Sequence, residues 1–299
     1  MKLTAELMLV PYAPPEATSS ARVADLARAA EGAGFDAIGF NDHPAPAKRW
    51  LDSGGHEAFD PFAALTFCAA VTSRIRLMPF LAVVPYRHPL LLAKSVATVD
   101  KLSDGRLVVC AGTGYLRGEF ASLGADFEER NQRFDDALSI LQSLWTDGWS
   151  ESPQSRPLPV QLPHPPIWIG GNSALTRRRV AAVAQGWTPM MAGEALSKVT
   201  RTAAISSLDR LRAAIDELRD MTSGYGRDPD SLEIQVNGAL HSQEGAEDLS
   251  AERYLESIAS LEGIGVTQVV VHLELDDSRR AEETIASFGT HVIPVLNRG

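Results

Sequence analysis

The stretch "PPIWIGGNSALTRRRV", residues 165–180, decides how the chain is understood. Its apolar run over 167–169 predicts a buried strand, and a helical pattern begins after Ser173. Between them stands the bare step Gly170-Gly171. It either makes a tight turn, or it lets an anionic ligand touch backbone N–H groups at a helix N-terminus. The architecture around this strand-to-helix unit must decide which explanation is relevant.

Strand-like and helix-like segments alternate along the whole chain. Most of the strand-like segments are short, apolar and β-branched, as strands covered on both faces tend to be. The expected strands are 3–10, 36–41, 75–82, 106–112, 166–170, 186–191, 231–238 and 267–273. Helical spacing follows over 18–33, 60–73, 92–102, 134–145, 173–185, 197–220, 250–262 and 278–289.

Eight successive strand-then-helix units predict an α/β fold, a (β/α)8 TIM barrel with extended loops at the top, formed by 1–299 as a single domain. A doubly wound sheet is the alternative. It usually has fewer strands and a glycine fingerprint after the first strand, where this chain has "VPYAPP". The barrel is therefore favoured.

Composition limits the classes of partner. The chain has 299 residues, of which 44% are hydrophobic, and a formal net charge of −10, which argues against nucleic acid or an anionic membrane as a main partner. No apolar run approaches the roughly 20 residues that span a bilayer, and the N-terminus lacks a signal-peptide core. Cys68 and Cys110 have no ligand-like spacing, so we expect reduced core thiols in a cytoplasmic protein.

In a TIM barrel the active site lies where strands end and helices begin. The second strand ends in "NDHP" (41–44), which places His43 where an imidazole can exchange a proton near neutral pH. The alternative is a capping Asp42 beside a solvated His43. The long junctions 41–60 and 112–127 are candidate lids.

The third and fourth junctions are also distinctive. The third, "PFLAVVPYRHP" (79–89), stays apolar past the strand end, which indicates a bulge, a flat wall for a planar ring, or simply a long buried strand. The fourth, "AGTGYLRGEF" (111–120), carries Gly112 and Gly114, which allow close backbone approach, and Tyr115, which can stack or hydrogen-bond. A turn alone would also explain both glycines.

At the fifth junction, residues 170–173 offer consecutive N–H groups at a helix N-terminus, a site suited to phosphate. Arg177, Arg178 and Arg179 follow, but they point in different directions, so at most two reach a ligand. The seven histidines are scattered without metal-ligand spacing, and no metal site is predicted. A G-x-S-x-G nucleophile elbow is also absent from the sequence.

Four motifs together resemble one known family. They are "GFDAIGFNDHP" (34–44), the long run over 74–124, "FEERNQRFDDALSILQSLWT" (127–146) and "PIWIGGNSALTRRRVAAVAQGWTPM" (166–190). The chain resembles the luciferase-like flavin and deazaflavin oxidoreductases, which are (β/α)8 barrels, and is most similar to their coenzyme F420-dependent members. The resemblance is strong over residues 1–192 and weak beyond them.

The resemblance implies several site features. It implies a non-prolyl cis peptide at Phe80-Leu81 that supports the cofactor ring, and a cofactor phosphate against 170–173. It places His43 near the reactive carbon of the ring. Sugar-phosphate dehydrogenases of the family carry Glu where this chain has Tyr115, so sugar-phosphate oxidation is disfavoured. We expect Glu119, four residues on, to face away.

The resulting hypothesis is an oxidoreductase that transfers a hydride between F420 and a small, largely apolar organic substrate. His43 and Tyr115 are the expected catalytic residues. The expected cofactor-binding residues are Asn41, Asp42, Phe80, Leu81, Ala82, Gly112, Thr113, Gly114, Gly170, Gly171, Asn172, Ser173, Trp187 and Met190. The basic residues Lys48, Arg49, Arg87 and Arg117 would suit the acidic tail of F420 and would equally suit solvent.

Two alternatives stay open. An FMN-dependent monooxygenase on the same barrel would need a flavin reductase as its partner. A flavin-binding barrel without catalysis is the second alternative. The resemblance also implies a homodimer through the helices beside the second and third strands.

Overall fold

The computed structural model describes residues 1–146, 156–239, 250–276 and 279–298. Its strands are β1 (Lys2–Leu9), β2 (Ala37–Phe40), β3 (Arg76–Pro79), β4 (Ala82–Val83), β5 (Val109–Gly112), β6 (Ile167–Gly170), β7 (Gly186–Thr188), β8 (Glu233–Val236) and β9 (Gln268–Leu275). Its longer helices are α1 (Ser20–Ala33), α3 (Pro61–Val71), α4 (Pro89–Leu102), α6 (Arg130–Thr146), α7 (Ala174–Val183), α9 (Leu208–Gly224), α10 (Ala251–Glu262) and α11 (Arg280–Ser287).

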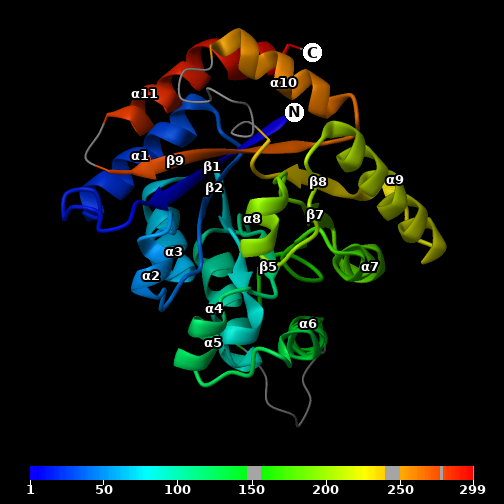
Figure 1. The fold of residues 1–299 in the computed structure, drawn as a ribbon. Coiled ribbons are helices and arrows are strands. Elements are labelled where there is room, and N and C mark those ends of the chain that lie inside the picture. Colours follow the sequence, from blue (N-terminus) through cyan, green and yellow to red (C-terminus); the bar gives the residue numbers. More distant parts are fainter. Residues whose placement is uncertain (147–155, 240–249, 277–278, 299) are drawn as a thin grey trace.

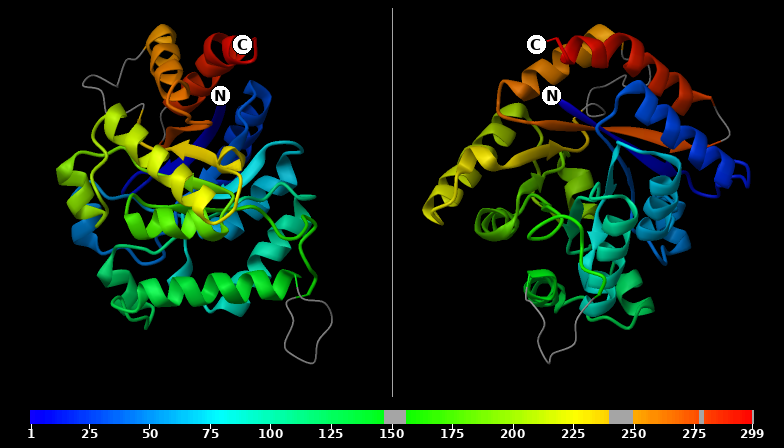
Figure 2. Two further views of the ribbon diagram at one scale, coloured as in Figure 1. Left: turned by 90° about the vertical axis from the view of Figure 1, so that its right-hand side faces the viewer. Right: turned by 180° about the vertical axis from the view of Figure 1, so that it is seen from behind.

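Shorter elements join the main ones. They are α2 (Lys48–Leu51), α5 (Arg117–Ser122), α8 (Glu194–Val199) and α12 (Ile293–Leu296), the 3-10 turns Val84–Tyr86 and Pro229–Ser231, and a π-helical turn Phe288–Val292. Figure 1 shows the helices surrounding the strands, and the view from behind in Figure 2 shows the same arrangement.

The strands form one parallel barrel, as the alternating pattern predicts. Their order is β3-β2-β1-β9-β8-β7-β6-β5-β4, and every strand pair is parallel. The ring closes through the segment before β5, because Leu77 of β3 pairs with Leu107 and its N–H donates to the carbonyl of Arg106 at 3.0 Å. The predicted (β/α)8 TIM barrel is therefore confirmed.

The expected third strand, 75–82, is two strands in the structure. β3 ends at Pro79, and β4 begins at Ala82. The peptide between Phe80 and Leu81 is cis, which confirms the expected non-prolyl cis bond. β3 pairs with β2, whereas β4 pairs with β5. The expected helix over 197–220 is also divided, into α8 and α9, which leaves residues 200–207 as a loop above the barrel.

The apolar core lies mainly between the strands and the outer helices. Inside the barrel, a smaller cluster contains Met78, Cys110 and Trp168. Polar groups there bond to one another: Gln235 donates to the hydroxyl of Thr4 at 2.7 Å. Both cysteines of the chain are buried and free, as expected. Among the described residues, the structure contains no helix with the length and apolar character needed to cross a membrane.

Leu81 lies against glycines of two different strands. A Cβ at Gly112 would stand 2.9 Å from Leu81 Cδ1, and a Cβ at Gly170 would stand 2.3 Å from the same atom. Carbon atoms do not approach so closely, so a side chain at either position would force Leu81 to move. This packing explains the first glycine of the Gly170-Gly171 step.

Replacing Gly170 therefore tests the packing of Leu81. We expect Gly170→Ala to lower the free energy of unfolding by about 1–3 kcal/mol, because overpacking forces Leu81 or the strand to move. Urea unfolding followed by circular dichroism measures this. Gly32→Ala is the matched control, because Gly32 lies in α1 with no atom within 4 Å of its added Cβ.

The double variant Gly170→Ala/Leu81→Ala should be less destabilised than the sum of its two single variants, since the clash disappears. Strict additivity would contradict the contact between these two positions.

Candidate active site

A cavity of about 1700 Å³ occupies the C-terminal ends of the strands. Its volume exceeds the range of roughly 300–1,000 Å³ that is typical of small-ligand pockets, so it has room for a large cofactor together with a substrate. The predicted site residues that line it are Asn41, Asp42, His43, Phe80, Leu81, Gly112, Thr113, Gly114, Tyr115, Gly170, Gly171, Ser173 and Met190. Most of the predicted site residues therefore line this cavity.

Three predicted cofactor-binding residues do not line the cavity. Trp187 is fully buried in the layer between strands and helices, and its indole N–H donates to the carbonyl of Gly171 at 2.9 Å. Asn172 is buried, and its side-chain amide donates to the carbonyls of Met190 at 2.8 Å and Ala203 at 2.7 Å. Ala82 is buried in the core. These residues support the wall and do not form it.

The phosphate site expected at 170–173 differs in its hydrogen-bond donors, because two of the expected backbone N–H groups already have partners. The N–H of Gly171 already donates to the carbonyl of Thr188 at 3.2 Å, and that of Asn172 to the hydroxyl of Thr202 at 2.8 Å. The first turn of α7 offers N–H groups that have no partner within the helix. Ser173 caps this helix, and its hydroxyl lies 3.0 Å from that of Thr176. An anion site here would be formed by the two hydroxyls and the start of α7.

His43 is bonded to a carboxylate, which overturns the expectation that Glu119 faces away. His43 Nδ1 lies 3.1 Å from Glu119 Oε2, and Glu119 is 1% exposed. The Tyr86 hydroxyl donates to the same oxygen at 2.8 Å, and the Ala45 N–H donates to the other at 3.1 Å. An ionised carboxylate only accepts hydrogen bonds, so His43 carries its proton on Nδ1 and leaves Nε2 available.

Three rings surround His43. The centroids of Trp50, His56 and Tyr115 lie 4.6, 4.8 and 5.8 Å from its own. Burial, and then repulsion from His43, lowers the pKa of His56 to about 4, so His56 is neutral at neutral pH. Burial, reinforced by the charge of Glu119, raises the pKa of Tyr115, whose hydroxyl therefore keeps its proton.

Asp42 acts as an anchor for the split strand. Its Oδ2 accepts from the N–H of Val83 in β4 at 2.8 Å. Arg87 forms a bidentate ion pair with Asp42, and it also reaches Asp60 at 3.1 Å. Arg87 is thus engaged by two carboxylates and is not available to an acidic cofactor tail.

A second pair of a histidine and a carboxylate lies deeper in the barrel. Glu6 of β1 and His272 of β9 are register partners, and Glu6 Oε2 lies 2.7 Å from His272 Nδ1. Burial alone lowers the pKa of His272, but the charge of Glu6 and a hydrogen bond to it raise that pKa above its ordinary value. The Asn41 amide donates to Glu6 at 2.6 Å and to the carbonyl of Phe80 at 3.2 Å. Glu6 is therefore linked to the cis peptide.

The arginines after β6 have separate roles. Arg177 donates to the carbonyl of Asn172 at 2.8 Å and pairs with Glu217 at 2.5 Å. Arg179 is 8% exposed and holds Asp135 of α6 with two bonds of 2.6 and 2.8 Å. Arg178 is exposed to solvent. Of these three arginines, Arg179 alone lines the cavity.

Sequence reasoning did not assign several residues of the cavity wall. Among them are Glu6, His56, Arg130, Thr176, Arg201 and His272. Glu6 had a detectable signal, a charge inside an apolar strand. Thr176 lies one helical turn after Ser173, a spacing that places both hydroxyls on one side of the helix start. Arg201 had no such signal in the sequence, because it falls within the expected helix 197–220.

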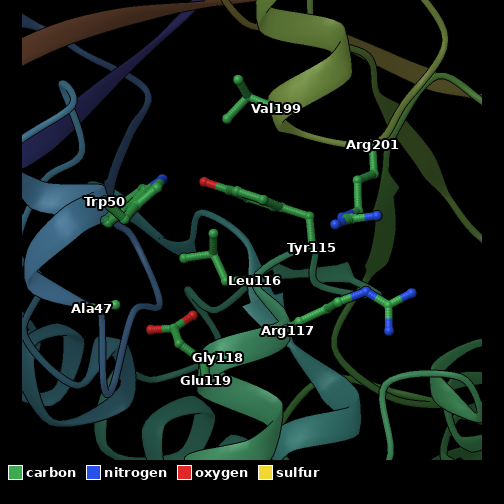
Figure 3. Close-up of a pocket in the computed structure, with 9 residues that line it drawn as sticks. All are labelled: Ala47, Trp50, Tyr115, Leu116, Arg117, Gly118, Glu119, Val199 and Arg201. Carbon is green, nitrogen blue, oxygen red and sulfur yellow. The ribbon is translucent and has the colours of Figure 1, made fainter.

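A smaller cavity of about 150 Å³ adjoins the first, and both are lined by Trp50, Tyr115, Val199 and Arg201. Figure 3 shows Tyr115 extending towards Trp50, with Arg117 and Arg201 projecting on its opposite side. Glu119 belongs to this wall as well, so the residue that holds His43 lies between the two spaces.

Comparisons with known proteins agree with this geometry. A family model described as luciferase-like monooxygenase matches residues 7–288. An F420-dependent glucose-6-phosphate dehydrogenase from Microbacterium testaceum is 25% identical, with 92% of this chain and 93% of that protein covered. The structure of the monooxygenase RslO1 from Streptomyces bottropensis has a TM-score of 0.78 at 20% identity, with 99% of this chain and 100% of that one covered.

One further relative uses a different cofactor. An FMNH(2)-dependent dimethylsulfone monooxygenase from Pseudomonas putida is 25% identical, with 61% of this chain covered. The match spans about half of that protein's length, 48%. Relatives with F420 and with FMN in their names therefore lie at the same level of identity.

The neutral state of His56 makes stability depend on pH. His56 takes up a proton near pH 6.5 in the unfolded chain but only near pH 4 in the folded protein. The contribution of neutral His56 to stability is therefore fully present above pH 6.5 and is lost as the pH falls towards 4. The expected loss is roughly 3 kcal/mol of unfolding free energy. Urea unfolding across this pH range should show a smaller loss in His56→Gln. The same pH dependence in both proteins would contradict the assignment.

The contact with Glu119 determines which nitrogen of His43 carries the proton. In Glu119→Gln, the amide oxygen must still accept from the Ala45 N–H, so the amide nitrogen faces His43 and donates to Nδ1. We expect His43 to change from the Nδ1–H to the Nε2–H tautomer, as measured by nitrogen NMR of labelled histidine. Tyr86→Phe, which leaves the carboxylate in place, should keep the original tautomer. Unchanged His43 nitrogen shifts in Glu119→Gln would refute the contact.

Proposed function

The chain belongs to the luciferase-like monooxygenase family, and on that premise we propose that it is an F420-dependent oxidoreductase. It transfers a hydride between the deazaflavin and a small, largely apolar organic substrate. The observation that carries this proposal is the imidazole of His43, fixed by Glu119 through Nδ1 at the wall of a large cavity. Its Nε2 is then the nitrogen that exchanges a proton with a bound molecule.

The wall fits a planar ring with a phosphate-bearing side chain. Phe80, Leu81 and Val83 give one apolar side, and Met190 lines the cavity as well. The start of α7 with Ser173 and Thr176 would hold the phosphate, because helix N-termini favour anions. When bound, the deazaflavin supplies hydride transfer at a ring carbon.

The residues of the chain contribute orientation and proton handling. Leu81, fixed against Gly112 and Gly170, gives a rigid floor, and the apolar wall excludes water from the reacting groups. Glu119 keeps the proton of His43 on Nδ1, so His43 takes or gives a proton at Nε2. The protonated hydroxyl of Tyr115 is a second hydrogen-bond donor beside it.

The choice of F420 rests on the F420-dependent dehydrogenase, a relative whose match covers 92% of this chain. Sugar-phosphate oxidation itself is not proposed, because the resemblance places Tyr115 where sugar-phosphate dehydrogenases carry Glu. The apolar side chains of the cavity, among them Leu196 and Val199, favour an apolar substrate.

An FMN-dependent monooxygenase is the second candidate. The FMNH(2)-dependent relative favours it, and a phosphate site at α7 would serve FMN equally well. This enzyme would need a separate reductase to deliver reduced flavin. A barrel that binds flavin without catalysis is the third possibility.

Titration separates these candidates. We expect F420 to bind the purified protein at micromolar concentration or tighter, with FMN at least tenfold weaker, as followed by cofactor fluorescence. In a screen of unsaturated and carbonyl substrates, His43→Ala should keep F420 affinity and lose about 10²–10⁴ in rate, the usual contribution of a general acid or base. Preference for FMN would support the monooxygenase. Rates unaffected by His43→Ala would refute the role of this residue.

A further inference from the structure

Three arginines gather around one aromatic ring beside the cavity. The guanidinium carbons of Arg130, Arg117 and Arg201 lie 3.9, 4.3 and 5.3 Å from the ring centroid of Phe127. They come from three separate segments: the first residue of α6, the first residue of α5 and the loop after α8. The fold therefore brings Arg201 to a place where Arg117 and Arg130, which lie close together in the sequence, already flank Phe127.

The arginine cluster has little compensating negative charge. Glu128 pairs with Arg117 at 2.6 Å, and both side chains are more than half exposed. Across the residues that the structure describes, Arg130 and Arg201 form no ion pair, although Arg130 donates to the carbonyl of Phe127 at 2.8 Å. Burial lowers the pKa of Arg130; Glu128 opposes this, while Arg117 and Arg201 add to it. Contact with the ring face of Phe127 offsets only part of the repulsion among the three arginines.

The cluster adjoins the phosphate site inferred at α7. Arg130 and Arg201 line the large cavity, and Arg117 and Arg201 line the small one. The next residue after Arg201, Thr202, accepts the N–H of Asn172 at 2.8 Å, so this loop packs against the start of α7. Arg117, on the other side, is 54% exposed. The cluster thus lies beside the inferred phosphate site and reaches solvent.

Arg201 also has an unusual backbone. Its φ is +52°, a left-handed conformation that is unfavourable for residues other than glycine and asparagine. Such positions persist where surrounding structure requires them, and they are frequent at ligand-binding sites. Here the conformation directs the Arg201 side chain to Phe127 and the other two arginines.

We propose that Arg117, Arg130 and Arg201 form a subsite for the carboxylates of a cofactor tail that extends beyond the phosphate. This inference rests on the proposed function, because F420 carries such an acidic tail whereas FMN ends at its phosphate. The subsite would make the protein prefer a deazaflavin with its glutamates over the same molecule without them. It would act through charge, so salt should weaken the preference.

The test compares two deazaflavins on two proteins. Fluorescence titration gives the Kd of F420 and of the deazaflavin with its glutamates removed, for wild type and for Arg117→Gln/Arg201→Gln. We expect the double variant to bind F420 at least tenfold more weakly and the shortened form within twofold of wild type. Arg178→Gln, which removes one exposed charge from neighbouring α7, should change neither Kd by more than twofold. Thermal unfolding checks that the double variant is folded.

Equal weakening of both deazaflavins, or no weakening of either, would overturn the subsite while leaving F420 as the cofactor. If wild type binds neither form, the proposed function fails, and the subsite is then tested alone with a tri-γ-glutamate peptide by calorimetry. Peptide binding that the double variant loses would support the arginine cluster as a carboxylate site. Absence of peptide binding to wild type would overturn it.

Discussion

The packing of Leu81 against Gly112 and Gly170 is the constraint on which the top of the barrel depends. One side chain contacts two strands at positions where no Cβ fits. Its place is fixed by the split of the third strand, whose first half pairs with β2 and whose second half pairs with β5. Asp42 also anchors β4 through the N–H of Val83. The two contacts together hold the apolar floor of the cavity in place.

Above this floor, three histidines differ because of their neighbours. Glu119 holds His43 through Nδ1, while His56 packs edge-on against the same ring and is kept neutral by burial. Deeper in the barrel, Glu6 favours the charged form of His272. His43 combines a tautomer fixed by a carboxylate with a nitrogen left for a bound molecule, whereas Nδ1 of His56 lies 3.3 Å from the carbonyl of Glu57. The role of each histidine therefore depends on whether a carboxylate contacts it.

The sequence predicted the barrel well because strand and helix periodicities depend on local patterns. It did not predict side-chain directions at the strand ends. Trp187 was expected in the wall. Because successive strand residues face opposite sides, its neighbour Thr188 lines the cavity and Trp187 packs in the core. Glu119 was expected to face away, yet the short helix α5 returns it to His43. Arg201 lies in a loop because the expected helix 197–220 is divided into α8 and α9. This division depends on tertiary packing, which local sequence patterns do not reveal.

A crystal structure of the protein grown with F420 would show directly how the cofactor lies in this site. We predict the ring against Leu81, within reach of His43 Nε2, and the phosphate at Ser173 and Thr176. A cofactor bound elsewhere, or a ring at Leu81 with its phosphate away from the start of α7, would contradict this placement.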